Sequence, residues 1–364
     1  MKIDVITMHS VKNYGSALQT YATQYILRDK LKYDVEIIDY RAGVRSTKSY
    51  FLEKPKGKYN KIKKILYVIY KFPERLLNYI VFEKFLKKNI NTTKRRYHNY
   101  EELYANPPVA DIYMTGSDQT WTFVYGFDKA YFLDFTNKKK IAYAASFGKS
   151  TLNEDEISKI KSLLKKYKAI SVREETGLDI LKQCDINGGK CLLDPTMLLS
   201  IKDWNNLYVQ SKLNVKEKYL LIYMLGNVPR MYDYAKEIAD KYGYKIIKFG
   251  WDYLKPKNVD KIYRSSSPVD FIYLFQNAQY IVTNSFHGTA FAINFNKPFI
   301  TIPPDENNAR FNSILDMTNL QSKNMYNGLR IEEAIRKIDY NKINDILNKK
   351  REESINFLKN NIKE

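Results

Sequence analysis

Polar residues capable of acid–base and anion-binding chemistry follow several short apolar runs in this chain. The clearest case lies between Tyr280 and Ala292, where a β-branched run ends at Thr283 and His287 precedes a helix with an apolar face. In a parallel sheet this turn lies at the carboxyl end of a strand, where open α/β sheets bind ligands. Backbone N–H groups and the helix dipole favour an anion there. The alternative is that His287 only starts the helix and is held by a local hydrogen bond.

Arg173 occupies a similar position after the apolar run 169–172. Its planar guanidinium suits a carboxylate or a phosphate, which makes it a candidate for substrate binding. An ion pair with Glu174, Glu175 or Asp194 is the structural alternative.

Two more turns carry polar side chains that could contact a substrate. Asp118 could act as a base, or it could only cap its turn through the backbone. Ser117 precedes it, and Trp121 could stack on a sugar or belong to the core. Near the N-terminus, Asn13 and Gly15 could position a ligand or serve only the turn.

Familiar catalytic signatures are missing from the sequence. No GxxxxGK[ST] loop is present, no GxGxxG follows the first strand, and GxSxG does not occur. Three histidines and two cysteines form no cluster, so we expect no metal site and no bound cofactor. These residues alone indicate an α/β enzyme that handles an anion.

The elements that position these turns alternate between strands and helices. The pattern predicts an α/β fold in which two Rossmann-like parallel-sheet domains face a cleft. We expect the first domain over residues 1–205, with a helical insertion at 41–100, and the second over 216–330. Residues 331–364 form a charged helical tail that we expect to pack back on the first domain.

The insertion carries most of the excess positive charge. Between Lys54 and Arg96, eleven lysines and three arginines face only Glu74 and Glu83, and the whole chain has a formal charge of +20. We predict two helices, 61–70 and 75–88, separated at Pro73. A helical hairpin with a solvated basic face is one interpretation, and peripheral contact with an anionic membrane through residues 54–96 is the other.

The chain lacks the apolar run of about 20 residues that a membrane span needs. Its first residues contain Asp4 within their only apolar run and therefore predict a strand, not a signal peptide. The chain has only two cysteines, which we expect to be reduced thiols. Together these features favour a cytoplasmic protein, or one peripheral at the inner face of the plasma membrane.

Six short motifs occur in order along the chain. They are residues 13–19 (Asn-Tyr-Gly-Ser-Ala-Leu-Gln), 116–119 (Gly-Ser-Asp-Gln), 144–148 (Ala-Ala-Ser-Phe-Gly), 171–174 (Ser-Val-Arg-Glu), 193–196 (Leu-Asp-Pro-Thr) and 285–291 (Ser-Phe-His-Gly-Thr-Ala-Phe). Together they resemble the polysaccharide pyruvyl transferase family, from the first strand to about Arg310. The insertion and the tail carry no part of the resemblance.

The resemblance implies a GT-B-like fold and a reaction. Family members transfer the enolpyruvyl unit of phosphoenolpyruvate to two sugar hydroxyls as a cyclic ketal, and the acceptors are often lipid-linked precursors of bacterial surface polysaccharides. It also implies that Arg173 and His287 contact phosphoenolpyruvate. Known members carry Arg-x-His in the last motif, but here Ser285 occupies the arginine position, and Arg310 is the candidate substitute.

We therefore expect a pyruvyl transferase in which His287 and Asp118 are catalytic. Substrate contacts are expected from Arg173, Arg310, Ser285, Gly288, Asn13, Gly15, Ser117 and Trp121. Two other functions fit the sequence less well: a GT-B glycosyltransferase that uses a nucleotide sugar, and a basic nucleic-acid-binding protein. No nucleic-acid motif accompanies the charge, so we expect no nucleic-acid partner.

Overall fold

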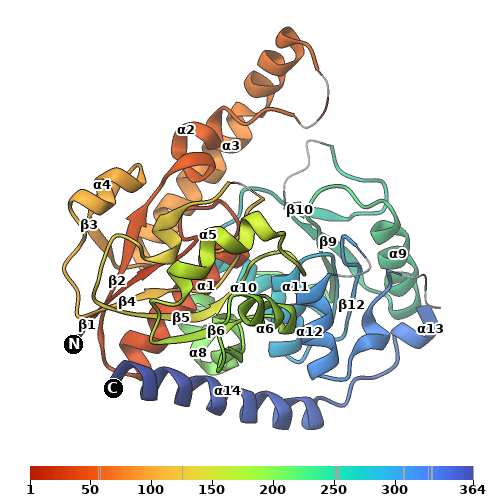
Figure 1. Ribbon diagram of the computed structural model, residues 1–364. Coiled ribbons are helices and arrows are strands. Elements are labelled where there is room, and N and C mark those ends of the chain that lie inside the picture. The colour runs from red at the N-terminus through yellow and green to blue at the C-terminus, as the bar shows by residue number, and fades with distance from the viewer. Residues whose placement is uncertain are drawn as a thin grey trace. The chain divides into compact units, whose positions relative to one another are not determined.

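The computed structural model describes residues 1–363, except for 56, 58, 125, 251–253, 306–307, 327 and 329–330 (Figure 1). The chain divides into two compact units. Unit 1 comprises Met1–Pro195 and Phe357–Glu364, and unit 2 comprises Thr196–Asn356. Each unit contains one β-sheet.

Unit 1 contains a seven-stranded sheet in the order β3-β2-β1-β4-β5-β6-β7, with parallel pairing throughout. The strands are β1 Lys2–Ile6, β2 Asp34–Tyr40, β3 Thr92–Tyr97, β4 Ile112–Thr115, β5 Lys139–Ala145, β6 Ala169–Val172 and β7 Lys190–Cys191. The helical segments are α1 Tyr14–Gln24, η1 Tyr25–Lys30, η2 Gly43–Arg45, α2 Thr47–Phe51, α3 Lys61–Asn89, α4 Tyr100–Ala105, η3 Lys129–Phe132, α5 Glu154–Leu164 and α6 Glu175–Gln183.

Unit 2 contains a five-stranded parallel sheet in the order β10-β9-β8-β11-β12. The strands are β8 Tyr219–Tyr223, β9 Lys245–Phe249, β10 Lys261–Tyr263, β11 Tyr280–Thr283 and β12 Phe299–Thr301. Helices from the unit boundary onward are α7 Pro195–Leu198, α8 Ile201–Tyr208, α9 Arg230–Tyr242, α10 Pro268–Asn277, α11 Phe286–Asn294, α12 Ala309–Met317, η4 Gln321–Lys323, α13 Ile331–Ala334 and α14 Tyr340–Lys363.

The α/β fold class with two parallel sheets is thus confirmed. In both sheets the strand order reverses beside the first strand of the unit: β1 lies between β2 and β4, and β8 lies between β9 and β11. Such reversal points leave a crevice outside the carboxyl ends of the two central strands, where open α/β sheets bind ligands. Most candidate site residues lie just after β1, β4 and β11, which border these reversal points, while Arg173 follows β6 and Arg310 lies in α12 after β12.

Local side-chain caps start two of the helices, α5 and α10. Asn153 caps α5, because its Oδ1 accepts the Glu156 N–H at 2.8 Å. In return, the Asn153 N–H donates to Glu156 Oε2 at 3.1 Å. Ser267 and Asp270 form the same reciprocal capping box at the start of α10. A cap of this kind is typically worth about 1 kcal/mol, because it satisfies backbone donors that the helix leaves open.

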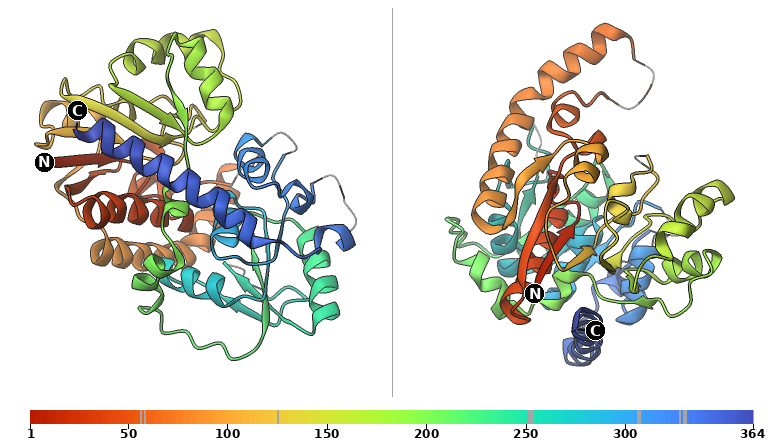
Figure 2. Two further views of the ribbon diagram at one scale, coloured as in Figure 1. Left: turned by 90° about the horizontal axis from the view of Figure 1, so that it is seen from below. Right: turned by 60° about the vertical axis from the view of Figure 1, so that its left-hand side comes forward.

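The insertion differs from the prediction in two ways. Pro73 lies inside one continuous helix, α3, which Figure 2 (right) shows without a break. One missing backbone donor costs a 29-residue helix a single hydrogen bond, so flanking turns hold it together. In addition, Thr92–Tyr97 forms β3 at the edge of the sheet, where exposed polar side chains obscure the strand pattern. Lys56 and Lys58 lie outside the described residues.

Asp4 occupies an unusual position, in the middle of β1 with none of its surface exposed. Neither carboxylate oxygen has a hydrogen-bond partner in the described part of the chain. Burial raises the pKa of Asp4 to about 7, with smaller increases from Glu36 and Asp34, while Lys2 at 3.9 Å opposes the shift.

The raised pKa of Asp4 predicts a loss of stability as pH rises. Between its unfolded pKa near 4 and its folded pKa near 7, the folded state holds the proton that the unfolded state has released, so the free energy of unfolding falls across that range. We expect Asp4→Asn, which cannot ionise, to gain stability relative to wild type between pH 5 and pH 8. Urea unfolding at the two pH values measures this gain. An equal difference at both would contradict the prediction.

Candidate functional site

The turn after β1 brings Asn13 and Gly15 to the start of α1. Asn13 is the N-cap residue, and its Oδ1 accepts the Ser16 N–H at 3.2 Å. Gly15 and Ser16 are buried in the first turn of the helix. Asn13 thus serves the turn, and through that cap it fixes the position of Ser16.

Asp118 lies in the turn after β4 and joins the two turns. The Ser16 hydroxyl donates to Asp118 Oδ2 at 2.5 Å, and the Gln119 N–H donates to Asp118 Oδ1 at 2.9 Å. The backbone of Asp118 has φ = 80°, in the left-handed region that costs most residues about 1–2 kcal/mol. Strain of this kind concentrates at functional sites. The two hydrogen bonds give the Asp118 carboxylate a fixed orientation.

Arg173 lies at the end of β6 among three carboxylates. Its Nη1 is 3.1 Å from Asp194 Oδ2 and 3.7 Å from Asp118 Oδ1, and its Nε is 3.8 Å from Glu174 Oε2. The side chain is 1% exposed. Burial acts to lower the pKa of Arg173, but the attraction of Asp194, Asp118 and Glu174 outweighs it and raises the pKa.

Two serines complete this cluster of charged groups. Ser117 donates its hydroxyl to Asp194 Oδ2 at 3.1 Å, and Ser146 donates to Glu174 Oε1 at 2.7 Å. The ion pair between Arg173 and Asp194, which the sequence left open as an alternative, is therefore present. We call Ser16, Ser117, Asp118, Ser146, Arg173, Glu174 and Asp194 the carboxylate cluster of unit 1.

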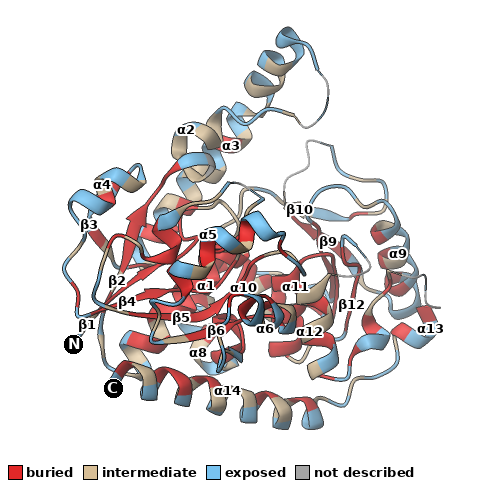
Figure 3. Cartoon of the chain, viewed as in Figure 1, coloured by how far each residue is buried: buried red, intermediate tan, exposed pale blue. Residues whose placement is uncertain are grey.

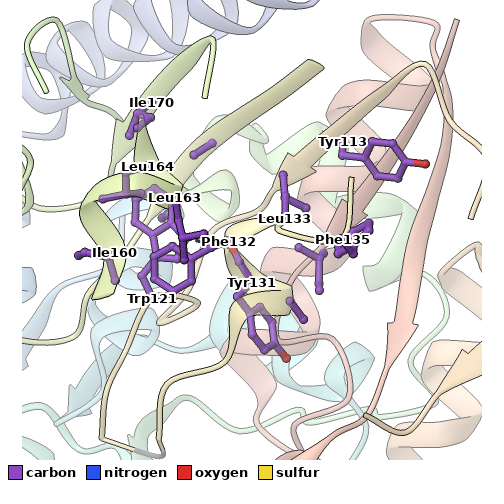
Figure 4. Packing of buried hydrophobic residues seen from close by; sticks show 14 of the residues in the cluster. Tyr113, Trp121, Tyr131, Phe132, Leu133, Phe135, Ile160, Leu163, Leu164 and Ile170 are labelled. Carbon is purple, nitrogen blue, oxygen red and sulfur yellow. Dashed lines mark hydrogen bonds between the residues drawn. The ribbon is translucent and has the colours of Figure 1, made fainter. Parts of the chain in front are cut away.

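Trp121 belongs to the hydrophobic core of unit 1. It is 1% exposed, its ring stacks on Phe132 at 5.7 Å, and its indole N–H donates to the Tyr131 carbonyl at 3.1 Å. Figure 4 shows it among buried residues that include Leu163. Sugar stacking by Trp121 is not supported, because the aromatic signal in the sequence reflects packing.

In unit 2, Ser285 caps α11 at the carboxyl end of β11. Its Oγ accepts the Gly288 N–H at 3.3 Å, and its carbonyl accepts the Thr289 hydroxyl at 3.2 Å. Ser285 is 4% exposed. Its short side chain suits this buried capping position but supplies no charge for a substrate.

Gly288 allows α11 to approach the sheet closely. A Cβ at this position would lie 2.2 Å from Thr283 Oγ1 and 3.0 Å from Tyr223 Cδ1. Thr283 cannot turn away easily, because its hydroxyl donates to the Tyr223 carbonyl at 2.8 Å and accepts the Ser285 N–H at 3.1 Å. Only glycine fits here without displacing the strand or the helix.

His287 lies in the first turn of α11 and is 8% exposed. Its ring meets that of Phe286 edge-on, with centroids 5.2 Å apart. The Phe286 ring in turn lies edge-on to the ring of Phe311 in α12, with centroids 6.4 Å apart. Arg310 precedes Phe311, so the start of α12 brings an arginine to the neighbourhood of the α11 N-terminus.

Asn284 connects the two loops at the reversal point of the second sheet. Its Oδ1 accepts the Leu225 N–H at 2.7 Å and its Nδ2 donates to the Leu225 carbonyl at 2.8 Å. This pair of bonds ties the end of β8 to the end of β11. The α11 N-terminus, with its backbone donors, is therefore held in a defined place and suits an anion.

The sequence-predicted site residues thus fall into two groups. Unit 1 brings together Asn13, Gly15, Ser117, Asp118 and Arg173, and unit 2 brings together Ser285, His287 and Gly288, with Arg310 on the adjacent helix. Sequence reasoning missed Ser16 and Thr283. Ser16 was visible as the third residue after the cap Asn13, whereas nothing in the sequence marked Thr283. Among the residues described, no group of three or more His, Cys, Asp or Glu is arranged to hold a metal.

Comparison with known proteins adds one family and one fold. The family model described as polysaccharide pyruvyl transferase matches residues 13–306, a stretch that contains both groups of site residues except Arg310. No curated protein sequence is significantly similar to the chain.

Several solved structures are similar over nearly the whole chain. The glycotransferase of kitacinnamycin has a TM-score of 0.50 at 10% identity and covers 99% of this chain and 98% of its own. The glycosyltransferase SsfS6 of Streptomyces sp. SF2575, complexed with thymidine diphosphate, scores 0.49 at 12% identity, covering 99% of each chain. UDP-GlcNAc 2-epimerase from Neisseria meningitidis has a TM-score of 0.49 at 12% identity, and the match covers 97% of this chain and 94% of the epimerase chain. At these identities the likeness concerns the fold, which is GT-B-like.

Gly288→Ala should destabilise unit 2 by about 1–3 kcal/mol, because the new methyl group overlaps the Thr283 hydroxyl. Urea unfolding of the single variants and of Gly288→Ala/Thr283→Ala forms a double-mutant cycle. We expect the double variant to lose less than the sum of the two single losses.

Gly243→Ala is the matched control. Gly243 has φ = +68°, and no atom lies within 4 Å of the place that an added methyl group would take, so its substitution costs only backbone strain, about 1 kcal/mol. Thr283→Ala should not relieve that cost. Strict additivity at Gly288 would show that the contact with Thr283 does not matter.

Proposed function

This chain belongs to the polysaccharide pyruvyl transferase family, and from that premise we propose that it transfers pyruvate from phosphoenolpyruvate to two hydroxyls of a sugar, as a cyclic ketal, in bacterial surface polysaccharide biosynthesis. The observation that carries the proposal is the position of the family motifs. In unit 1, Ser16 and Asp118 from two motifs meet where the strand order reverses, and Arg173 from a third lies beside Asp118. In unit 2 the last motif, residues 285–291, begins α11 directly after β11. Phosphoenolpyruvate is a metabolite of the cytoplasm, so we propose that the reaction runs there.

The reaction forms two C–O bonds at the central carbon of phosphoenolpyruvate and breaks two there: the π bond to the methylene carbon and the bond to the phosphate oxygen. A proton adds to the methylene carbon, the first sugar hydroxyl adds to the central carbon, and the bond from that carbon to the phosphate oxygen breaks. The second hydroxyl then adds, which closes the ketal. Two hydroxyl protons are lost in all: their number matches one proton added to the new methyl group and one that leaves with the phosphate. The protein must therefore hold an anion, supply a proton and accept protons from hydroxyls.

Unit 2 suits the donor. The N-terminus of α11 offers backbone N–H groups and the positive end of a helix dipole to a phosphate or carboxylate. We propose that His287, in this first turn, protonates the methylene carbon or stabilises the departing phosphate. Arg310, at the start of the adjacent helix, is the proposed replacement for the arginine that the family carries where this chain has Ser285.

Unit 1 suits the acceptor. The Ser16 hydroxyl and the Arg173 guanidinium hold the Asp118 carboxylate in place. We propose that this carboxylate accepts a proton from an attacking hydroxyl. Ser117 and the turn at Asn13 to Gly15 would complete the acceptor contacts. For Arg173 we propose a positioning role in place of direct donor contact, because its guanidinium is buried among carboxylates.

Removing the imidazole of His287 should abolish most of the transfer. In an assay with phosphoenolpyruvate and candidate lipid-linked sugars, we expect His287→Ala to lower phosphate release by about 10²-fold or more, since general acids typically contribute about 10²- to 10⁴-fold. Mass spectrometry of the acceptor should show the pyruvate ketal with wild type. His98→Ala is the matched control, because His98 is exposed. A loss of only a few-fold at His287 would exclude the proposed role.

Asp118→Asn should preserve the fold and remove the base. Asparagine tolerates the left-handed backbone at this position and keeps the size of the side chain, while its amide cannot accept the proton. We expect a decrease in kcat of about 10²-fold or more with little change in thermal stability. Asp179→Asn on the exposed face of α6 controls for loss of one negative charge. Full activity of Asp118→Asn would assign the carboxylate to structure alone.

A glycosyltransferase that uses a nucleotide sugar is the second candidate, favoured only by the fold likeness to the glycotransferase of kitacinnamycin. Calorimetric titration separates the two. Binding of phosphoenolpyruvate without binding of a nucleoside diphosphate supports pyruvyl transfer, and the reverse result supports glycosyl transfer.

A further inference from the structure

Helix α3 exposes a continuous row of large apolar side chains. We call it the apolar stripe. Its members recur every three or four residues, so they share one face of the helix. They are Ile62, Ile65, Leu66, Ile69, Phe72, Leu76, Leu77 and Ile80, each between 39% and 67% exposed. Figure 3 shows the exposed surface of α3 in pale blue. Single exposed apolar residues are ordinary, but a continuous stripe marks an interaction surface.

Basic residues flank the apolar stripe at both ends. Lys61 and Lys63 are exposed at its start, and Lys84, Lys87 and Lys88 are exposed beyond its end. Along the stripe itself the sequence contains one acidic residue, Glu74. That carboxylate is bound by Lys71 at 2.6 Å. The surface therefore combines an apolar centre with a positive border.

Other contacts fix α3 so that the apolar stripe faces outward. Arg75, 6% exposed, donates to the carbonyls of Phe51 and Glu53 at 3.0 Å each. Further along the helix, Phe82, Phe85 and Leu86 are buried. The stripe is thus not the face that the helix uses to pack on unit 1.

We propose that the apolar stripe docks α3 onto an anionic lipid bilayer, with the helix axis in the plane of the surface. The stripe would enter the acyl boundary while the lysines contact lipid phosphates. Its length from Ile62 to Ile80 is about 27 Å at 1.5 Å per residue, enough for a stable interfacial contact. No described helix is long and apolar enough to cross a membrane, which fits a helix lying on the surface.

The charge pattern selects a bilayer over two other partners. In a dimer of this chain, stripe against stripe, the lysine borders would face each other, and like charges repel. A nucleic acid would use the lysines but would leave the aliphatic side chains in water, since base recognition relies on polar and aromatic contacts. An anionic membrane satisfies both parts of the surface.

The inner half of α3 reaches the acceptor turn of unit 1. Glu83 accepts hydrogen bonds from Lys12 and Arg41, each at 2.6 Å, and the Phe82 ring lies 5.0 Å from that of Tyr14. Lys12 and Tyr14 flank Asn13, which caps α1. Docking would thus hold the acceptor turn near the membrane, where a lipid-linked sugar resides. This last step rests on the proposed function, whereas the docking itself does not.

Vesicle co-sedimentation tests the docking. We expect wild-type protein to bind vesicles of phosphatidylcholine with about 30% phosphatidylglycerol at least tenfold more tightly than phosphatidylcholine alone, and to lose affinity as NaCl rises. The triple variant Ile65→Gln/Ile69→Gln/Leu76→Gln, called the α3 variant below, should bind the anionic vesicles at least tenfold more weakly than wild type. The control Val109→Gln/Val209→Gln/Leu254→Gln, at positions outside α3 that are more exposed than those three, should bind as wild type does.

Three results would overturn the proposal: no vesicle binding by wild type, equal loss in the control, or sedimentation equilibrium that shows a dimer dissolved by the α3 variant. Duplex DNA binding that survives the α3 variant, without vesicle binding, would also assign the charge to another partner. Thermal unfolding checks that each variant folds.

A paired activity assay separates docking from chemistry. The α3 variant should transfer pyruvate normally to a water-soluble form of the acceptor and slowly to the same sugar on a lipid in vesicles. Loss with both acceptors would contradict the link between docking and the acceptor turn. No transfer by wild type to either acceptor would refute the proposed function and leave the vesicle result to stand by itself.

Discussion

In both sheets every strand pairs in parallel, so the chain must cross back over the sheet after each strand, and all strands of a sheet end at one edge. Every turn that carries a candidate site residue begins at such an end. The reversal of strand order beside β1 and beside β8 then separates the flanking crossover helices and opens the space in which those turns meet. The bonds between Asn284 and Leu225, and between Ser16 and Asp118, each span a reversal point and lock the turns together.

Around Asp118, Glu174 and Asp194 the balance of charge depends on the buried guanidinium of Arg173. Arg173 neutralises part of the charge of Asp118, Glu174 and Asp194. Each of these charged groups loses hydration energy when it is buried, and the attraction of its partners offsets that loss. Removing the guanidinium would leave three carboxylates close together in a poorly hydrated place. The arginine is therefore better understood as the group that keeps these turns of unit 1 folded and Asp118 oriented. A buried cation of this kind cannot move to a ligand without abandoning those carboxylates.

The sequence located β6 and β11 well, because strands buried on both faces appear as short apolar runs that contain β-branched residues. It failed at β3, an edge strand with exposed polar side chains, and at Pro73, where the surrounding helix compensates for one absent donor. The motifs located the site turns. They could not show that Trp121 is core or that Arg173 is enclosed by acids, since both facts depend on contacts between distant segments.

The same limit applied to α3. Its composition showed that the segment is basic, but not which face of the helix packs against the rest of unit 1. A solvated basic surface and a membrane contact have the same lysine content, and they differ in where the aliphatic side chains point. In the structure the buried contacts come from Arg75, Phe82, Phe85 and Leu86, while the apolar stripe remains in contact with water. Leaving apolar surface hydrated forgoes about 25 cal/mol for each Å². A stripe of eight large side chains thus represents a substantial free energy that only an apolar partner can recover, and the flanking lysines restrict that partner to one with negative charge at its surface.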